Sequence, residues 1–304
     1  MNIGRGLVTA AVVVAATVGG AGIAQAAAAE PTISVTAGRL VLEPGARGYQ
    51  GSLPVVVTYQ GDQPDYANFT LVEPVPGAFT GLRPSEACTF NTPEEGPREI
   101  GCGVPGGDLR PGERRRFVID FQVLTTPRDY AMSAPASSIE VALGSTPGVT
   151  AGATSATLFR STSGSVRNPQ PYVQDTKSDI SVTVQDATLV RQDDGSYAGR
   201  VPVTVRYAGD APHYELFADI ALPEGVELQG LDPEEVCGIT WCSVPGGRFM
   251  AGETRTFHVL VSAPATTPTG AAGSGAITIT SNWSGNVEDV DPSDNTAPFA
   301  LTIG

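Results

Sequence analysis

The sequence predicts an all-β protein: two tandem antiparallel β-sandwiches that follow an N-terminal leader. Two observations support this fold class. Residues 49–66 read YQGSLPVVVTYQGDQPDY and residues 197–214 read YAGRVPVTVRYAGDAPHY, while CGVPGG at 102–107 returns as CSVPGG at 242–247. A repeat of this spacing is as long as a whole domain. Both copies also alternate apolar and polar residues between turn-forming segments, as sheets with one buried face do.

Residues 1–28 have the pattern of a signal peptide. A weakly basic start ends at Arg5, residues 6–23 are uncharged and rich in Ala, Val and Gly, and AQA at 24–26 offers small residues to a signal peptidase. We expect cleavage after Ala26 or Ala28. The alternative, an uncleaved membrane anchor, is disfavoured because no basic stop follows the apolar run. We expect no second anchor at the C-terminus, and therefore an extracellular protein.

The first copy is predicted to contain six strands. Leu53, Val55, Val57 and Tyr59 alternate with other residues, so that they share one face of an extended segment. Phe117, Ile119 and Phe121 repeat the pattern further along, and we find no convincing helical periodicity. We expect strands near 32–42, 52–60, 67–73, 114–124, 136–143 and 154–160.

The second copy repeats this arrangement. Val201, Val203, Val205 and Tyr207 alternate as their counterparts do. We expect strands near 179–190, 199–207, 214–222, 254–262, 275–282 and 296–303. The resulting domains are 31–160 and 179–304, each long enough to bury a two-sheet core. Residues 161–178 are rich in Gly, Pro, Ser, Asn and Gln, which predicts a linker.

Charge is unevenly distributed along the chain, whose formal net charge is −14. Residues 31–165 carry 10 basic and 13 acidic residues, whereas residues 178–304 carry 5 basic and 17 acidic ones. Nucleic acids and anionic membrane surfaces require a basic surface, so neither is an expected partner, and we expect no membrane insertion after signal cleavage. The acidic second half is compatible with cations or a basic partner.

The chain has four cysteines, and in an exported protein these predict disulfides. The repeat aligns Cys88 with Cys237 and Cys102 with Cys242, which predicts the bridges Cys88–Cys102 and Cys237–Cys242. The loop enclosed by the first pair is nine residues longer than that enclosed by the second. A zinc site is the alternative, but the sequence contains no Cys-x-x-Cys and the two pairs fall in different domains.

The second copy resembles the bacterial extracellular immunoglobulin-like repeats of the conserved-repeat and CARDB type. The resemblance lies in LPEGVEL at 222–228, the second cysteine pair, GRFMAGETRTF at 247–257 and DVDPSDNTA at 289–297. The first copy has the middle of this pattern, but GSTPGVT at 144–150 replaces the acidic closing segment. The resemblance implies two seven-stranded immunoglobulin-like sandwiches with surface or matrix roles. It implies neither a common ligand nor a catalytic residue.

The acidic closing segment is the strongest candidate for a metal site. Asp289, Asp291, Asp294 and Asn295 offer the oxygen ligands that Ca²⁺ prefers. The alternative is a solvated turn whose Asp and Asn side chains bind their own backbone. The EF-hand spacing is absent, and we expect no other cofactor.

Two further groups are candidates for binding. Arg114, Arg115 and Arg116 form a basic triplet that suits a polyanion, or alternatively protects a strand edge from aggregation. Trp241, inside the short cysteine loop, is the aromatic residue most expected to be exposed. Together with Trp283, Tyr66 and Tyr214 it would suit a carbohydrate-binding surface; alternatively, the tyrosines pack at the start of a strand.

The chain carries no signature of an enzyme active site. It contains neither Gly-x-Ser-x-Gly nor His-Glu-x-x-His nor a phosphate-binding glycine loop. We therefore expect a secreted, non-catalytic structural or interaction protein of the bacterial cell envelope or medium, whose partner is an envelope protein or glycan. The alternative is a carbohydrate- or peptide-binding accessory protein.

Overall fold

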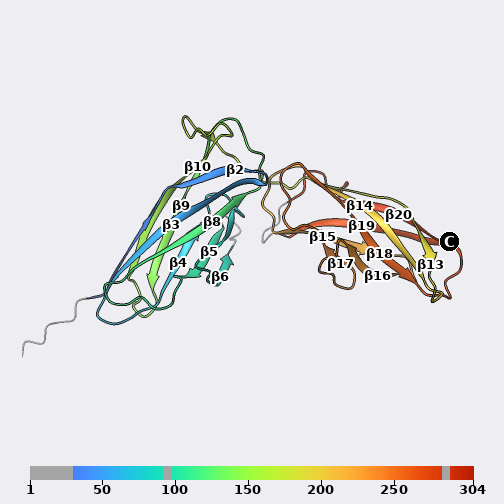
Figure 1. Ribbon diagram of the computed structural model, residues 1–304, viewed down its shortest axis with the longest axis horizontal. Coiled ribbons are helices and arrows are strands. Elements are labelled where there is room, and N and C mark those ends of the chain that lie inside the picture. Colours follow the sequence, from blue (N-terminus) through green and yellow to red (C-terminus); the bar gives the residue numbers. More distant parts are fainter. Residues whose placement is uncertain (1–29, 92–97, 283–287) are drawn as a thin grey trace, which may run out of the picture.

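The computed structural model describes residues 30–91, 98–282 and 288–304, which form two β-sandwich domains joined end to end (Figure 1). Over these ranges the chain contains strands and turns but no helix, and therefore no helix long and apolar enough to cross a membrane. The predicted all-β class is confirmed.

The first domain is built from ten strands and a short eleventh. They are β1 (Thr32–Ala37), β2 (Leu40–Gly45), β3 (Gly48–Gln60), β4 (Ala67–Val72), β5 (Phe79–Arg83), β6 (Cys88–Asn91), β7 (Glu99–Gly103), β8 (Arg114–Val123), β9 (Met132–Leu143), β10 (Thr150–Phe159) and β11 (Gln170–Pro171). The pairing order is β5-β8-β3-β2-β10-β9-β4-β7-β6, with β1 on β3 and β11 on β9.

The second domain repeats this order with nine strands. They are β12 (Ile180–Val184), β13 (Ala187–Arg191), β14 (Tyr197–Tyr207), β15 (Glu215–Ala221), β16 (Glu227–Asp232), β17 (Trp241–Ser243), β18 (Glu253–Ala263), β19 (Gly270–Asn282) and β20 (Thr296–Ile303). The order β16-β18-β14-β13-β20-β19-β15-β17 corresponds to that of the first domain except that β6 has no counterpart, and β12 pairs with β14 as β1 does with β3.

The structure differs from the expected strands in two respects. A single strand was predicted at 32–42, but the chain breaks near Gly38, where an added Cβ would press on the ring of Pro54. The two halves pair differently, because β1 is antiparallel to β3 whereas β2 also runs parallel to β10. The sheets are therefore mixed, since β13 is likewise parallel to β20. The single strand predicted at 179–190 is likewise divided, into β12 and β13. Strands β5, β6, β7, β11, β16 and β17 were not anticipated, so the described domains have more than the seven strands that the family resemblance implied.

Each domain has its own hydrophobic core. The inward residues of β3 and β14 are almost completely buried, as their alternation predicted; they are Leu53, Val55, Val57, Tyr59, Val201, Val203, Val205 and Tyr207. The hydroxyl groups of Tyr59 and Tyr207 donate to the carbonyls of Gln63 and Ala211, at 2.8 and 2.7 Å. The repeated Gly-Asp-x-Pro turns thus provide acceptors for two buried tyrosines.

The segment between the domains is held by hydrogen bonds rather than left as a free tether. The hydroxyl group of Tyr172 donates to the Asp210 carboxylate at 2.9 Å. The side-chain amide of Gln174 donates to the carbonyls of Pro76 and Asp210, at 3.2 and 3.0 Å, and so links one domain to the other. β11 also adds to β9, which extends the sheet of the first domain toward the second.

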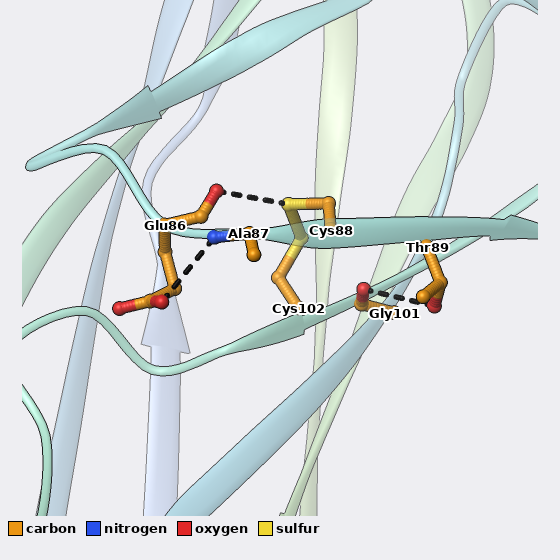
Figure 2. The surroundings of a disulfide bond; sticks show 6 residues. All are labelled: Glu86, Ala87, Cys88, Thr89, Gly101 and Cys102. Carbon is orange, nitrogen blue, oxygen red and sulfur yellow. Dashed lines mark hydrogen bonds between the residues drawn. A yellow bond between two sulfur atoms is a disulfide. The ribbon is translucent and has the colours of Figure 1, made fainter.

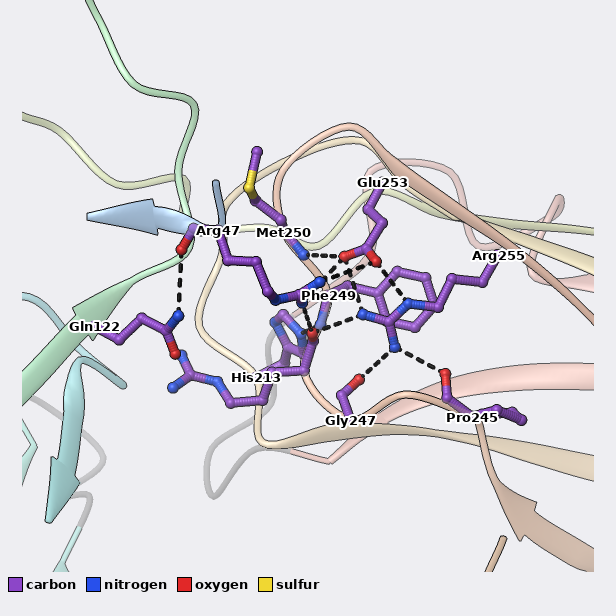
Figure 3. A network of polar contacts seen from close by, with 10 residues as sticks. Arg47, Gln122, His213, Pro245, Gly247, Phe249, Met250, Glu253 and Arg255 are labelled. Carbon is purple, nitrogen blue, oxygen red and sulfur yellow. Dashed lines mark hydrogen bonds and ion pairs between the residues drawn. The ribbon is translucent and has the colours of Figure 1, made fainter. Parts of the chain in front are cut away.

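The domain ends also contact each other directly (Figure 3). The backbone amide of Ala251 donates to the carbonyl of Leu124 at 2.9 Å. The guanidinium of Arg47 donates to the carbonyl of Arg248 at 2.6 Å and forms an ion pair with Glu253 at 3.3 Å. We call the contact between the two domains the joint.

A buried ion pair lies at the joint. The Glu73 carboxylate accepts hydrogen bonds from the amides of Gly77 and Phe79, at 2.9 and 2.6 Å. Its partner Arg98 approaches at 3.6 Å, and both side chains are almost fully buried. The Arg98 guanidinium lies 4.7 Å from the ring centroid of Tyr214 in the second domain. Charge and aromatic surface from both domains therefore meet here.

The longer cysteine loop of the first domain reaches this joint. Phe90 at the end of β6 lies 4.4 Å from the Arg98 guanidinium and 6.4 Å from the ring of Tyr214, measured to ring centroids. In the second domain the corresponding hairpin is reduced to an isolated bridge between Cys237 and Cys242. The longer loop of the first copy therefore takes part in the contact between the two domains.

Candidate functional site

The four cysteines form the disulfides Cys88–Cys102 and Cys237–Cys242. In the first domain the bridge joins directly opposed residues of β6 and β7, at the edge of the sheet (Figure 2). In the second domain the bridge closes a tight loop in front of β17. Both bridges have the pairing that the repeat predicts, and both pin a sheet edge.

The acidic segment at 289–295 forms a hydrogen-bonded turn. One oxygen of Asp289 accepts from the Ser178 hydroxyl at 3.0 Å and the Ile180 amide at 3.1 Å. Asp291 accepts from both the amide and the hydroxyl of Ser293, at 3.1 and 2.6 Å. The other oxygen of Asp289 accepts from the Asp291 amide at 3.0 Å, and this bond and those of Asp291 match the alternative of a turn that binds its own backbone.

The other two residues of the proposed calcium set also take part in backbone pairing. The carbonyls of Asp294 and Asn295 accept from the amides of Val182 and Ile279, at 2.9 and 2.8 Å. Burial, together with the nearby Asp291, Asp289 and Asp179, raises the pKa of Asp294. Within the described residues, no three histidine, cysteine or acidic side chains are grouped to hold a metal ion. Calcium binding stays a prediction.

The arginine triplet divides between two faces of β8. Arg114 and Arg116 are exposed, whereas Arg115 turns inward. The Arg115 guanidinium donates to the carbonyls of Pro105, Gly107 and Asp108 and contacts Glu113. Arg115 thus fastens the Pro-Gly-Gly loop, and polyanion binding stays a prediction for the two exposed arginines.

The second domain contains the same arginine clasp. Arg255 donates to the carbonyls of Pro245, Gly247 and Arg248 and pairs with Glu253 (Figure 3). Although burial opposes it, hydrogen bonds from Arg255, the Met250 amide and Arg47 lower the pKa of Glu253 to about 2. The clasp is therefore repeated in both domains, although the sequence has an arginine triplet only in the first.

Of the four aromatic residues considered for one carbohydrate surface, the three that the structure describes lie apart. Tyr66 is half exposed over Gly144 of the first domain, and Tyr214 lies at the joint. Trp283 lies outside the described residues. Trp241 is on β17, where its ring meets Phe217 edge-on at 5.3 Å between centroids. The tyrosines therefore do not contribute to a surface around Trp241.

The loop around the second disulfide gathers three exposed, large apolar side chains. The exposed fractions of Val236, Ile239 and Trp241 are 68, 91 and 38%. The loop is held by the disulfide and by amide-to-carbonyl bonds from Gly238 to Trp241 and from Ser243 to Val236, at 2.8 and 2.9 Å. It therefore presents apolar side chains on a fixed backbone.

The outer face of β15, β17 and β19 continues from this loop. Asp219 is paired with Trp241 on one side and Thr278 on the other, while Phe217 is paired with Thr280. We call the surface formed by Phe217, Asp219, Trp241, Thr278 and Thr280 the Trp241 face. A shallow hollow of about 280 Å³ adjoins this face at Asp219 and Thr278; its other lining residues are Ile220, Ala221, Thr240 and Ala276, so Trp241 lies beside it.

Sequence reasoning singled out Trp241 but missed its neighbours on this face. Phe217, Asp219 and Thr278 come from two strands whose relative register places them together. No local motif marks them. The buried residues Leu216, Ala218 and Ile220 alternate along β15, so the residues between them point outward. These outward positions were the signal that could have identified Phe217 and Asp219 as members of an exposed face.

Comparison with known proteins assigns no family. No protein-family model and no curated protein sequence matches this chain. Among solved structures, similarity extends to a protein of unknown function from Porphyromonas gingivalis W83, with 10% identity over 89% of this chain and 98% of that one, at a TM-score of 0.23. The resemblance to the CARDB-type repeat therefore stands on its motifs alone.

Two further structures of known type are similar. A non-cellulosomal cohesin from the archaeon Archaeoglobus fulgidus has 15% identity, covers 42% of this chain and 91% of its own, and gives a TM-score of 0.24. The CupB6 tip adhesin from Pseudomonas aeruginosa has 9% identity over 91% of this chain and 98% of its own, at a TM-score of 0.28. At these identities and scores, neither supports an argument about activity.

Proposed function

We propose that this protein is a secreted, non-catalytic interaction protein of the bacterial cell envelope or medium. In the part of the chain that the structure describes, each domain consists of strands and turns and contains one disulfide. Disulfides persist in oxidising compartments, which agrees with the leader pattern at the N-terminus.

The observation that carries this proposal is the exposed apolar loop of the second domain. Ile239 is almost fully in solvent, and Val236 and Trp241 lie beside it. Apolar side chains gathered on a surface mark sites of interaction, and aromatic residues are enriched among those that dominate binding energy. Because the disulfide already fixes the loop, binding would require little further ordering.

The histidines offer little support for a catalytic role. His213 is buried, its Nε2 accepts from the Phe249 amide at 2.8 Å, and its Nδ1 lies 3.3 Å from the carbonyl of Ala211. Burial lowers its pKa to about 4. Its imidazole is thus neutral near pH 7 and occupied by backbone groups, so it serves the fold of the loop rather than proton transfer.

Saturable binding to purified cell envelopes of the producing bacterium tests this proposal. We expect the labelled mature protein to bind and to be displaced by unlabelled protein. An Ile239→Ser, Trp241→Ala double variant is expected to lose most of this binding. The matched control is Val190→Ser, because Val190 is 60% exposed elsewhere in the same domain. Equal binding by both variants, or none by the wild type, would refute the proposal.

A further inference from the structure

We infer that the Trp241 face is a subsite for one neutral pyranose ring. This inference rests on the proposed function and names the chemistry of the partner. It begins with the row Thr296, Thr278, Asp219 and Trp241, which are successive cross-strand partners on β20, β19, β15 and β17. Hydroxyl groups, a carboxylate and an aromatic ring therefore follow one another across a single sheet surface.

This order of groups matches the two sides of a sugar ring. A pyranose has an apolar face of C–H bonds, which packs on an exposed aromatic ring, and a rim of hydroxyl groups, which donate to carboxylates and exchange bonds with hydroxyls. Asp219 is exposed, and the hydroxyl of Thr280 donates to it at a long distance of 3.5 Å. The carboxylate therefore retains capacity to accept bonds from a ligand.

The hollow lies beside Trp241 and meets the Trp241 face at Asp219 and Thr278. Its lining combines the apolar Ile220, Ala221 and Ala276 with the polar Asp219, Thr240 and Thr278. One sugar ring packed on Trp241 would direct hydroxyl groups toward Asp219 at the edge of the hollow, and the next residue of a glycan chain would extend over it.

Charge favours a neutral sugar over an anionic one. Asp219 is directly at the hollow, and residues 178–304 carry 17 acidic residues against 5 arginines. A uronic acid or sulfated sugar would meet repulsion from this domain.

A bound peptide is less well matched at this edge of the sheet. Strand addition requires free backbone groups along β17. The amide of Ser243 already donates to Val236, and the carbonyl of Trp241 already accepts from Gly238. The disulfide loop thus covers part of the edge that a peptide would use, whereas the side chains on the face stay accessible.

The first domain provides an internal comparison. Phe69 opposes Cys102 as Ala218 opposes Cys242, which aligns Thr70 with Asp219 and Gly101 with Trp241. The first domain thus has neither the ring nor the carboxylate at these two positions. The substitution Trp241→Gly installs the residue that the repeat itself uses.

Titration of soluble oligosaccharides tests the inference. The probes are cellohexaose, mannohexaose and chitohexaose, and the protein is the mature chain carrying Trp283→Phe, so that fluorescence reports Trp241 alone. We expect at least one probe to quench Trp241 saturably. Trp241→Gly and Asp219→Asn, measured by calorimetry, are expected to weaken binding about tenfold or more. Val190→Ser should bind as the wild type does, and circular dichroism verifies the fold of each variant.

The outcomes separate this inference from the proposed function. Envelope binding that persists without binding of any probe, or that soluble sugars do not displace, would overturn the sugar subsite and leave the interaction function standing. If Ile239→Ser lost envelope binding but kept its affinity for sugar, the envelope contact would be the loop. That outcome would also overturn the sugar subsite as the site that binds the envelope. Equal affinity of the wild type and Trp241→Gly for a probe would overturn the subsite.

Discussion

Replacing Arg98 with methionine is expected to destabilise the protein through the joint. The change removes the charged partner of Glu73 but keeps most of the apolar stem. Removing one member of a buried ion pair costs about 3–5 kcal/mol, because a buried charge is left without its partner. Glu73 keeps its two amide donors and the nearby charge of Arg248. We therefore expect a loss at the lower end of the range, about 3 kcal/mol at pH 7.

The pH dependence of this loss follows from the titration of Glu73. Burial raises the pKa of Glu73, while Arg98, the two amides and Arg248 oppose the rise. Without Arg98 the pKa of Glu73 rises further. Well below the ordinary carboxyl pKa, both the folded and unfolded states are protonated, so the loss is smallest there. Between the unfolded-state pKa and the folded-state pKa of the wild type, both proteins lose stability equally as the pH rises. The difference between them grows from the folded-state pKa of the wild type up to the higher folded-state pKa of the variant.

Urea unfolding at several pH values measures the effect. Both tryptophans lie in the second half of the chain, so their fluorescence follows that half, while circular dichroism follows both domains. Glu73→Gln and the double variant complete a mutant cycle, with Arg39→Met as an exposed control. A coupling energy below about 0.5 kcal/mol, together with a loss independent of pH, would refute the reasoning.

Three further predictions concern stability. Removing Cys88–Cys102 by double alanine substitution is expected to lower the free energy of unfolding by roughly 3 kcal/mol, and removing Cys237–Cys242 by roughly 2 kcal/mol, since the first disulfide closes the longer loop. A larger loss for the second variant in urea unfolding would contradict this. The second domain is expected to lose stability from about pH 6.5 toward pH 4, because burial lowers the pKa of His213 to about 4 and only the unfolded state takes up the proton; Trp fluorescence should show a flatter profile for His213→Gln. Gly48→Ala is expected to lower the melting temperature far more than Gly112→Ala. Both glycines have positive φ, but only at Gly48 would a Cβ strike the carbonyl of Val123; equal shifts in calorimetry would disprove it.

The sequence predicted the features that depend on local pattern and internal repetition. The alternation at 53–59 and 201–207 identified the buried faces of β3 and β14, because burial on one side of a sheet imposes a period of two. The repeat also aligned the cysteines into the pairs that the structure contains.

Features that depend on contacts between distant strands were not predicted. The split of the first expected strand could not be predicted because it depends on β10, which pairs with the first half of β2, while the second half pairs with β3. The role of Arg115 requires the position of the Pro-Gly-Gly loop relative to β8. Predicting the Trp241 face requires the register of β15, β17 and β19. Of the residues on this face, only Trp241 was marked by a local feature of the sequence.

The joint also determines how a ligand bound to the second domain is oriented relative to the first domain. Backbone and side-chain bonds connect the two domains at the Arg47, Gln174 and Ala251 contacts, and the hairpin of the first domain adds Phe90. If the second domain binds an envelope component as we propose, these contacts hold its binding site at a set distance and direction from the first domain. Anything bound to the second domain would be presented at a constant distance and angle from whatever anchors the first. If both domains bind partners, a fixed distance between the two sites raises the effective concentration for the second binding event only when the two partners lie at that same distance.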